Sequence, residues 1–95
     1  MKQHIISPEA NKDLEEIIDY FASRNIEAGE RFIDEFNKKC RYLANVPNMG
    51  RSYSDIKDYL RGISLNGYII FYRVTDIGIE ILRVVSGYRD YQSLF

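Results

Sequence analysis

Hydrophobic residues recur every three or four positions in the first half of the chain and every second position in much of the rest. In the first half they form two stripes, Ala10, Leu14, Ile17, Ile18 and Phe21, followed by Phe32, Ile33, Phe36, Cys40 and Leu43. This spacing predicts two amphipathic helices, each with one apolar face. Only residues 23–25 separate the two predicted helices, so the helices are expected to lie antiparallel.

Capping residues mark the ends of both predicted helices. Ser7 is expected to cap the first helix, with Pro8 at the first helical position. Asn25 is expected to cap the second helix. We expect that helix to end by Asn45, because Pro47 follows closely and cannot continue a helix.

An alternating pattern begins at Tyr59 and predicts a three-stranded antiparallel meander. The strands are expected at residues 59–65, 68–75 and 79–86, with turns at Asn66-Gly67 and at residues 76–78. A short strand at residues 2–6, a connecting loop at 51–58 and an irregular tail at 87–95 account for the remainder. The prediction is one α+β domain spanning residues 1–95: an N-terminal strand, an antiparallel helical hairpin and the meander, with the helices packed on one sheet face.

The two turns determine which side chains share a sheet face. A two-residue turn at Asn66-Gly67 pairs Leu65 with Tyr68, Ile63 with Ile70 and Arg61 with Tyr72. A three-residue turn at residues 76–78 pairs Thr75 with Ile79, Arg73 with Ile81 and Phe71 with Arg83. The helices are then expected to cover the face made by Ile63, Leu65, Tyr68, Ile70, Tyr72, Val74, Leu82 and Val84.

The opposite sheet face is expected to mix apolar and arginine side chains. It collects Leu60, Ser64, Ile69, Phe71, Arg73, Ile81, Arg83 and Val85. Both helices are already used, so this face is expected to be an exposed apolar patch ringed by arginines, which marks a binding surface. The alternative is that the tail folds back and that Tyr88, Tyr91 and Phe95 cover Phe71.

Composition excludes several classes of protein. The chain has 95 residues and a formal net charge of −1, which gives no overall electrostatic reason to bind nucleic acid. Cys40 is the single cysteine, so no intramolecular disulfide can form, and its helical setting favours a small buried side chain. No apolar run approaches the roughly 20 residues of a membrane span, so a cytoplasmic location is expected.

No motif predicts a metal site, a cofactor or a serine nucleophile. The only histidine, His4, has no partner at ligand spacing, and no glycine-rich phosphate loop is present. One enzymatic chemistry stays open, namely metal-independent RNA cleavage by positioned arginines and tyrosines. Arg73, Arg83 and Arg89 would then hold phosphates, while Tyr88 or Tyr91 would move a proton or stack on a base.

Several local strings, taken in order, resemble the toxins of the RelE/ParE superfamily of type II toxin–antitoxin systems. They are Ser7-Pro8-Glu9-Ala10 with Asp13-Leu14 and Ile17, Leu43-Ala44 with Pro47 and Gly50-Arg51, Leu60-Arg61-Gly62, Tyr68-Ile69-Ile70-Phe71-Tyr72-Arg73-Val74, and Ile81-Leu82-Arg83-Val84-Val85 with Gly87-Tyr88-Arg89-Asp90. The resemblance covers essentially the whole chain. It implies a bacterial growth inhibitor that is neutralised by a cognate antitoxin, ParD-like or related, with operator DNA contacted only through the antitoxin.

The resemblance leaves two activities open. RelE-like toxins cleave mRNA on the ribosome, and here the residues for that chemistry would be Arg61, Arg83, Arg89 and Tyr91. ParE-like toxins are not nucleases and inhibit DNA gyrase, which blocks replication. RelE-like toxins carry an arginine where this chain has Ile69, and lysines on the preceding strand where this chain has none. The ParE-like branch is therefore favoured, and no catalytic residue is assigned.

The resemblance also implies where partners bind and how the toxin assembles. Target or antitoxin contacts are expected at Leu60, Ile69, Phe71, Arg73, Ile81, Arg83, Val85, Tyr88 and Arg89. The assembly is expected to be a homodimer or a toxin–antitoxin hetero-oligomer. A third interpretation is an inactive relative that only binds the antitoxin and regulates the shared operon.

Overall fold

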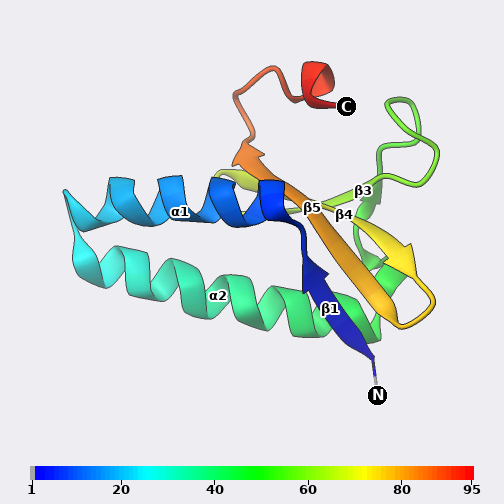
Figure 1. Cartoon of the computed structure of the whole chain (residues 1–95), viewed down its shortest axis with the longest axis horizontal. Coiled ribbons are helices and arrows are strands. Elements are labelled where there is room, and N and C mark those ends of the chain that lie inside the picture. The colour runs from blue at the N-terminus through cyan, green and yellow to red at the C-terminus, as the bar shows by residue number, and fades with distance from the viewer. Residues whose placement is uncertain (1) are drawn as a thin grey trace.

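The protein is an α+β structure in which two antiparallel helices pack on a five-stranded mixed sheet (Figure 1). The computed structural model describes residues 2–95. Its elements are β1 (Gln3–Ile6), α1 (Pro8–Ala22), α2 (Ile26–Asn45), the 3-10 turn η1 (Pro47–Met49), β2 (Arg51–Ser52), β3 (Arg61–Leu65), β4 (Tyr68–Thr75), β5 (Gly78–Ser86) and the 3-10 turn η2 (Tyr91–Leu94). The predicted fold class is confirmed.

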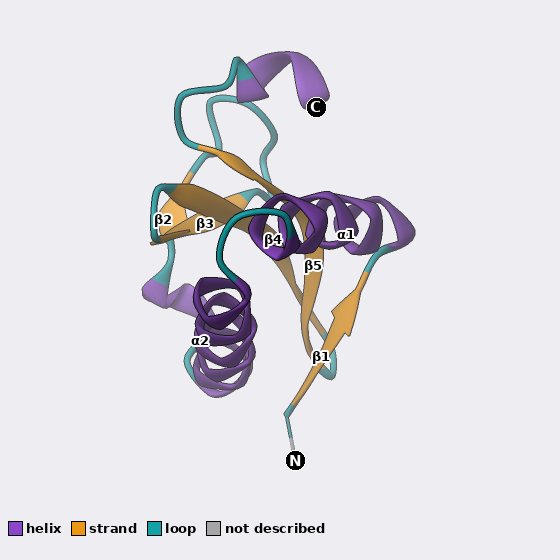
Figure 2. Cartoon of the chain, turned by 90° about the vertical axis from the view of Figure 1, so that its left-hand side faces the viewer, coloured by secondary structure: helices purple, strands orange, loops and turns teal. Residues whose placement is uncertain are grey.

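The sheet has the order β1-β5-β4-β3-β2. The meander β3-β4-β5 is antiparallel as expected, and β1 lies parallel to β5 at one edge. The other edge is the two-residue strand β2, which pairs with β3 inside a region that the sequence predicted as loop. In Figure 2, β2 and β3 lie on the same side of the molecule as α2.

The helix boundaries follow the capping residues in the sequence. The Ser7 hydroxyl accepts a hydrogen bond from Ala10 N–H at 3.1 Å and donates one to the Leu82 carbonyl at 3.0 Å. The Asn25 side chain accepts from Ala28 N–H at 3.1 Å. Each cap therefore satisfies a backbone donor that the first helical turn leaves unpaired, and Ser7 also anchors α1 to the sheet.

The larger hydrophobic core lies between the helices and the sheet. It contains Ala10, Leu14, Ile17, Phe32, Phe36, Cys40, Leu43, Ala44, Leu65, Ile70, Tyr72, Ile79, Ile81 and Val84. The ring of Tyr72 is fully buried, and its hydroxyl donates to the Pro47 carbonyl at 2.6 Å and accepts from Gly50 N–H at 2.9 Å. Tyr72 therefore anchors the chain segment that links α2 to β2.

A second core covers the opposite sheet face, where an open patch was expected. Leu60, Ile69, Phe71 and Val85 are buried there beneath Tyr53, Ile56, Leu82, Tyr91, Leu94 and Phe95. The Phe71 ring lies 5.3 Å from that of Tyr91 and 5.2 Å from that of Phe95, measured between centroids. The expectation of an exposed face is wrong, and the alternative that the tail covers Phe71 is confirmed for Tyr91 and Phe95. Figure 1 shows η2 above the sheet at the C-terminus.

The register of β3 with β4 is confirmed, whereas that of β4 with β5 is partly wrong. Asn66 and Gly67 adopt φ angles of 50° and 84°, as the predicted two-residue turn requires. The next turn also has two residues, so Thr75 pairs with Gly78 rather than Ile79, and Arg73 with Glu80 rather than Ile81. A β-bulge between Phe71 and Tyr72 then restores the expected pairing of Phe71 with Arg83.

The bulge also changes which side chains face the helices. Ile81 belongs to the helix-side core and Leu82 packs into the second core, the reverse of the prediction. Val74, expected beneath the helices, is exposed. A one-residue change in register moves the side chains of β5 to the other sheet face, which explains the errors at Ile81 and Leu82.

Candidate binding surfaces

Five of the nine residues predicted to contact a partner are buried. They are Leu60, Ile69, Phe71, Ile81 and Val85. The first three and Val85 form the second core, and Ile81 lies beneath the helices. Their predicted exposure is wrong because the tail and residues 53–60 cover the face on which they were expected.

Arg83 is half-buried in an ion pair with α1. Its Nε and Nη2 atoms donate to the two carboxylate oxygens of Asp13 at 2.8 and 2.9 Å, and Val84 N–H donates to the same carboxylate at 2.9 Å. This hydrogen bonding to Asp13 raises the pKa of Arg83 above its ordinary value, although burial opposes the shift. The Arg83 guanidinium therefore links β5 to α1.

The other two strand arginines also have partners within the chain. Arg61 donates through Nη1 to the carbonyls of Asn48 and Gly50, at 3.3 and 2.7 Å. Arg73 pairs at the surface with Glu80, with its Nε 2.6 Å from Oε1. Arg61 therefore supports the turn after α2, whereas Arg73 stays accessible to a partner.

Three of the four residues of the nuclease alternative contact other parts of the protein. Arg61 reaches the turn after α2, Arg83 reaches α1, and Tyr91 packs against the rings of Tyr53 and Phe71. Arg89 is exposed beyond the end of β5. Arg61, Arg83 and Tyr91 are therefore engaged within the chain, and Arg89 is accessible.

The turn after β5 presents Tyr88 and Arg89 to solvent. The Tyr88 side chain is 98% exposed. The backbone around it is held by hydrogen bonds from Gly87 N–H to the Gly67 carbonyl at 2.8 Å and from Arg89 N–H to the Ser86 carbonyl at 3.1 Å. Tyrosine and arginine are the residue types that anchor protein interfaces, and here a tied backbone holds them.

A groove of about 580 Å³ runs between α2 and β3, and we call it the α2–β3 groove. Its walls are Glu35, Lys38, Lys39, Tyr42, Met49, Ile63 and Leu65. The helices pack mainly on β5 and β1, which leaves the helix-side surface of β3 partly uncovered. Met49 and Tyr42 are 57% and 44% exposed, and two lysines stand on the rim. The groove therefore combines exposed apolar surface with positive charge.

Sequence reasoning missed the α2–β3 groove because the residues that α2 and η1 contribute to it lie outside the main helical stripe. Tyr42 follows Lys38 by four positions, which places the two side chains beside each other on one helix face. Met49 lies beyond the predicted end of the helix. A tyrosine and a methionine that belong to no predicted core face were the available signal.

Neither a metal site nor a membrane span is found in the described part of the chain. Within residues 2–95, no group of three or more His, Cys, Asp or Glu side chains is placed to hold a metal ion. No helix there has the length and apolar character needed to cross a bilayer.

Comparison with known proteins gives one consistent family. The sequence profile described as "ParE toxin of type II toxin-antitoxin system, parDE" matches residues 5–91. Two relatives named "Toxin ParE1", from the Mycobacterium tuberculosis strains CDC 1551 / Oshkosh and ATCC 25618 / H37Rv, are each 32% identical over 90 residues. The matched region is 93% of this chain and 92% of theirs.

A solved structure shares the fold. It is a chain from "Chromosomal ParDE TA system from P. aeruginosa", with a TM-score of 0.74 and 21% sequence identity. The match covers 90% of this chain and 96% of that one. The two-helix, five-stranded arrangement described above is therefore also found in that chain.

Proposed function

Because the chain belongs to the ParE toxin family of type II toxin–antitoxin systems, we propose that it arrests growth by inhibiting DNA gyrase and that a ParD-like antitoxin neutralises it. Membership of this family implies a cognate antitoxin. Gyrase as the target and a ParD-like protein as the antitoxin are what we propose.

The engagement of Arg61, Arg83 and Tyr91 within the protein is the observation that favours gyrase inhibition over mRNA cleavage. RNA cleavage without a metal needs donors and a proton-transfer group around one phosphate. Arg61 and Arg83 are engaged with the protein's own oxygens, and Tyr91 lies in an aromatic cluster. An inhibitor that acts by binding needs no such arrangement.

The α2–β3 groove is the surface we propose for the antitoxin. An amphipathic segment could place its apolar side chains against Tyr42, Met49 and Ile63, as helices do in apolar grooves. Lys38 and Lys39 on the rim favour acidic residues on that segment. Among the residues that the sequence predicted, Arg73, Tyr88 and Arg89 remain accessible and are proposed as further partner contacts.

Induction of the toxin without its antitoxin tests the proposed activity. New DNA and new protein are pulse-labelled during the first minutes, and purified gyrase is assayed for supercoiling with the toxin added. An early stop in DNA synthesis with continued translation, and loss of supercoiling, would support the proposal. An immediate stop in translation would indicate mRNA cleavage. If growth is unaffected, the proposed activity is contradicted, and the interpretation as an inactive relative that binds the antitoxin is favoured.

A further inference from the structure

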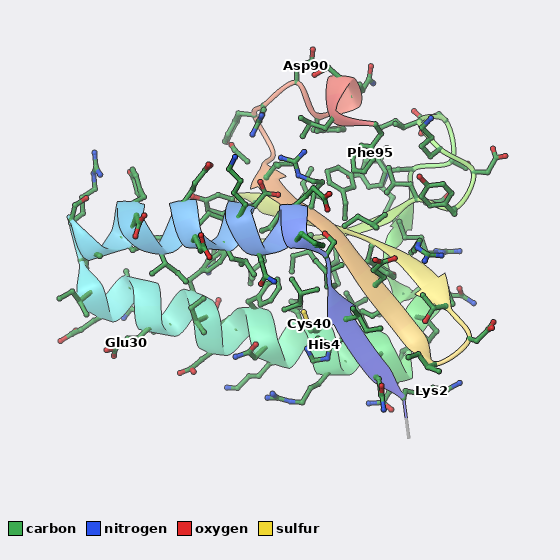
Figure 3. All side chains as sticks on the ribbon, viewed as in Figure 1. Lys2, His4, Glu30, Cys40, Asp90 and Phe95 are labelled. Atoms are coloured by element: carbon green, nitrogen blue, oxygen red, sulfur yellow. The ribbon has the colours of Figure 1, made fainter. Side chains whose placement is uncertain are left out.

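A second apolar groove lies near the free end of the helical hairpin, where α1 leads into α2. We call it the hairpin-end groove. It has a volume of about 300 Å³, and its walls are Ile18, Ala22, Ile26, Gly29, Glu30, Ile33 and Asp34. The hairpin end projects away from the sheet and the C-terminal turn in Figure 1, and Figure 3 labels Glu30 on its lower helix.

The groove exposes aliphatic side chains that the core does not use. Ile26 is 66% exposed and Ile18 is 41% exposed. Gly29 is explained by packing, since a Cβ there would lie 3.0 Å from the Cβ of Phe21. It also leaves the groove without a side chain at that position. Covering Ile26 with a partner would stabilise a complex through the hydrophobic effect.

The groove lies in the acidic part of a chain whose charges are segregated. Residues 15–35 carry seven acidic and two basic side chains, a net charge of −5, and the other residues carry seven acidic and eleven basic ones, a net charge of +4. One of the two bases, Arg24, stacks on the Tyr20 ring at 4.1 Å. The overall charge of −1 therefore hides a strongly negative hairpin end.

The two carboxylates on the rim have no internal role that accounts for them. Glu30 and Asp34 are one helical turn apart, so they repel each other and weaken the helix slightly. Neither forms an ion pair with any residue between 2 and 95. The helix dipole would stabilise an acid only in the first turn of α2, and Glu30 and Asp34 lie beyond that turn. Their charge is available to a cationic partner.

We propose that the hairpin-end groove docks a basic amphipathic segment of the toxin's target, with aliphatic side chains in the groove and lysines or arginines against Glu30 and Asp34. The identification of the occupant with the target rests on the proposed function, because an enzyme that handles DNA presents basic surfaces to its phosphates. The acidic rim repels nucleic acid itself. The opposite charges of the two grooves also mean that each favours a different ligand: a basic segment in the hairpin-end groove and an acidic segment in the α2–β3 groove.

A synthetic probe tests the groove without assuming the target. The probe is a fluorescent amphipathic helix of about 14 residues built from leucine and lysine, and a leucine–glutamate helix serves for comparison. The proteins are wild type, the double variant Glu30→Lys/Asp34→Lys and the charge-matched control Asp55→Lys/Asp58→Lys, whose sites lie in the exposed loop before β3. Ile26→Ser tests the apolar contact in a fourth protein. Thermal unfolding verifies that all of them are folded.

We expect the lysine probe to bind wild type and the control equally and the rim double variant about tenfold more weakly, which is ~1.4 kcal/mol. Ile26→Ser should weaken it as well, and added salt should reduce the difference between wild type and the rim variant. Equal binding of the lysine probe to wild type and the rim variant would overturn the proposal. An equal loss of probe binding in the control variant would also overturn it, because acidic side chains elsewhere on the surface would then attract the probe as well as the rim does.

The same proteins are then compared in the gyrase supercoiling assay. Loss of inhibition by the rim variant and by Ile26→Ser, with antitoxin affinity unchanged, identifies the target as the occupant. Full inhibition by both variants overturns the inference while leaving the proposed function intact. If the wild-type toxin does not inhibit gyrase, the proposed function fails, and the probe result alone decides whether the groove binds basic segments.

Discussion

Arg83 on β5 and Asp13 on α1 form a two-point ion pair across 70 residues of sequence, with nitrogen–oxygen distances of 2.8 and 2.9 Å. The same carboxylate accepts the Val84 N–H. Three donors converge on one side chain that is itself buried. This contact, together with the Ser7 cap, fixes how the helical hairpin sits on the sheet.

Replacing Asp13 by alanine should therefore destabilise the fold by about 2–3 kcal/mol, since the arginine and a backbone N–H both lose their acceptor. Urea unfolding gives the free energy. The matched control is Glu80→Ala, which removes the acceptor of the exposed Arg73 pair and should cost less than about 1 kcal/mol. Similar losses in the two variants would show that the Asp13 contact contributes no more than a surface pair.

Cys40 should make stability fall in alkaline solution. Burial raises the pKa of the Cys40 thiol to about 12 from the 9.0 of an exposed cysteine. The folded state thus keeps a proton that the unfolded state loses. The contribution of the Cys40 thiol to the free energy of unfolding is fully present below pH 9 and declines by up to ~1.4 kcal/mol per pH unit until about pH 12.

Unfolding free energies measured from pH 8 to pH 11 would show this decline, and Cys40→Ala should remove its onset near pH 9. Burial also raises the pKa of Tyr72, which adds a further decline at higher pH. A cysteine variant that keeps the full wild-type slope between pH 9 and pH 10 would contradict the assignment.

Tyr91 distinguishes a packing role from a catalytic one. Tyr91→Phe keeps the ring that contacts Tyr53 and Phe71, so both growth arrest and stability should stay close to wild type. Tyr91→Ala should cost about 2–4 kcal/mol by leaving a gap over Phe71. The readouts are colony formation after induction and the thermal midpoint. Growth arrest lost in a stable Tyr91→Phe protein would instead support the nuclease alternative.

The rim of the α2–β3 groove should control antitoxin affinity. Lys38→Glu/Lys39→Glu should weaken binding of the cognate antitoxin by about tenfold or more, through repulsion of an acidic segment. Calorimetry with the purified pair measures this. Lys57→Glu with Arg51→Glu makes the same change of charge outside the groove and should have a smaller effect. Unchanged affinity in the Lys38/Lys39 variant would place the antitoxin elsewhere.

Local sequence was sufficient for both helices and for the first hairpin. Ser7 and Asn25 predicted both helix starts, and Asn66-Gly67 predicted a turn whose register the structure matches. In each case the determining contacts lie within a few residues. Patterns of that range are what a single sequence contains.

The second hairpin was mispredicted because Gly78 is required by its packing against β1, which is distant in the sequence. Gly78 was interpreted as the last residue of a three-residue turn. In the structure its φ is 153°, and a Cβ there would lie 1.8 Å from the Gln3 carbonyl oxygen. Glycine is needed where β1 passes alongside, and no pattern near Gly78 reveals the parallel pairing of β1 with β5.

The candidate surfaces were mispredicted for a related reason. The exposure of Leu60, Ile69, Phe71 and Val85 depended on where nine tail residues with no periodicity would fold. Their aromatic side chains close over Phe71 through ring contacts that alternation does not encode. The two grooves arise from how α1, α2 and β3 are spaced, which only tertiary structure determines.

The lengths of the two edge strands bear on how the toxin behaves once its antitoxin is gone. β1 has four residues and β2 has two, so each edge offers only a short row of unpaired backbone groups. A foreign strand gains little by pairing with so few groups, and edge-to-edge aggregation is correspondingly weak. Release from the antitoxin should therefore leave a dispersed protein that is free to diffuse to its target.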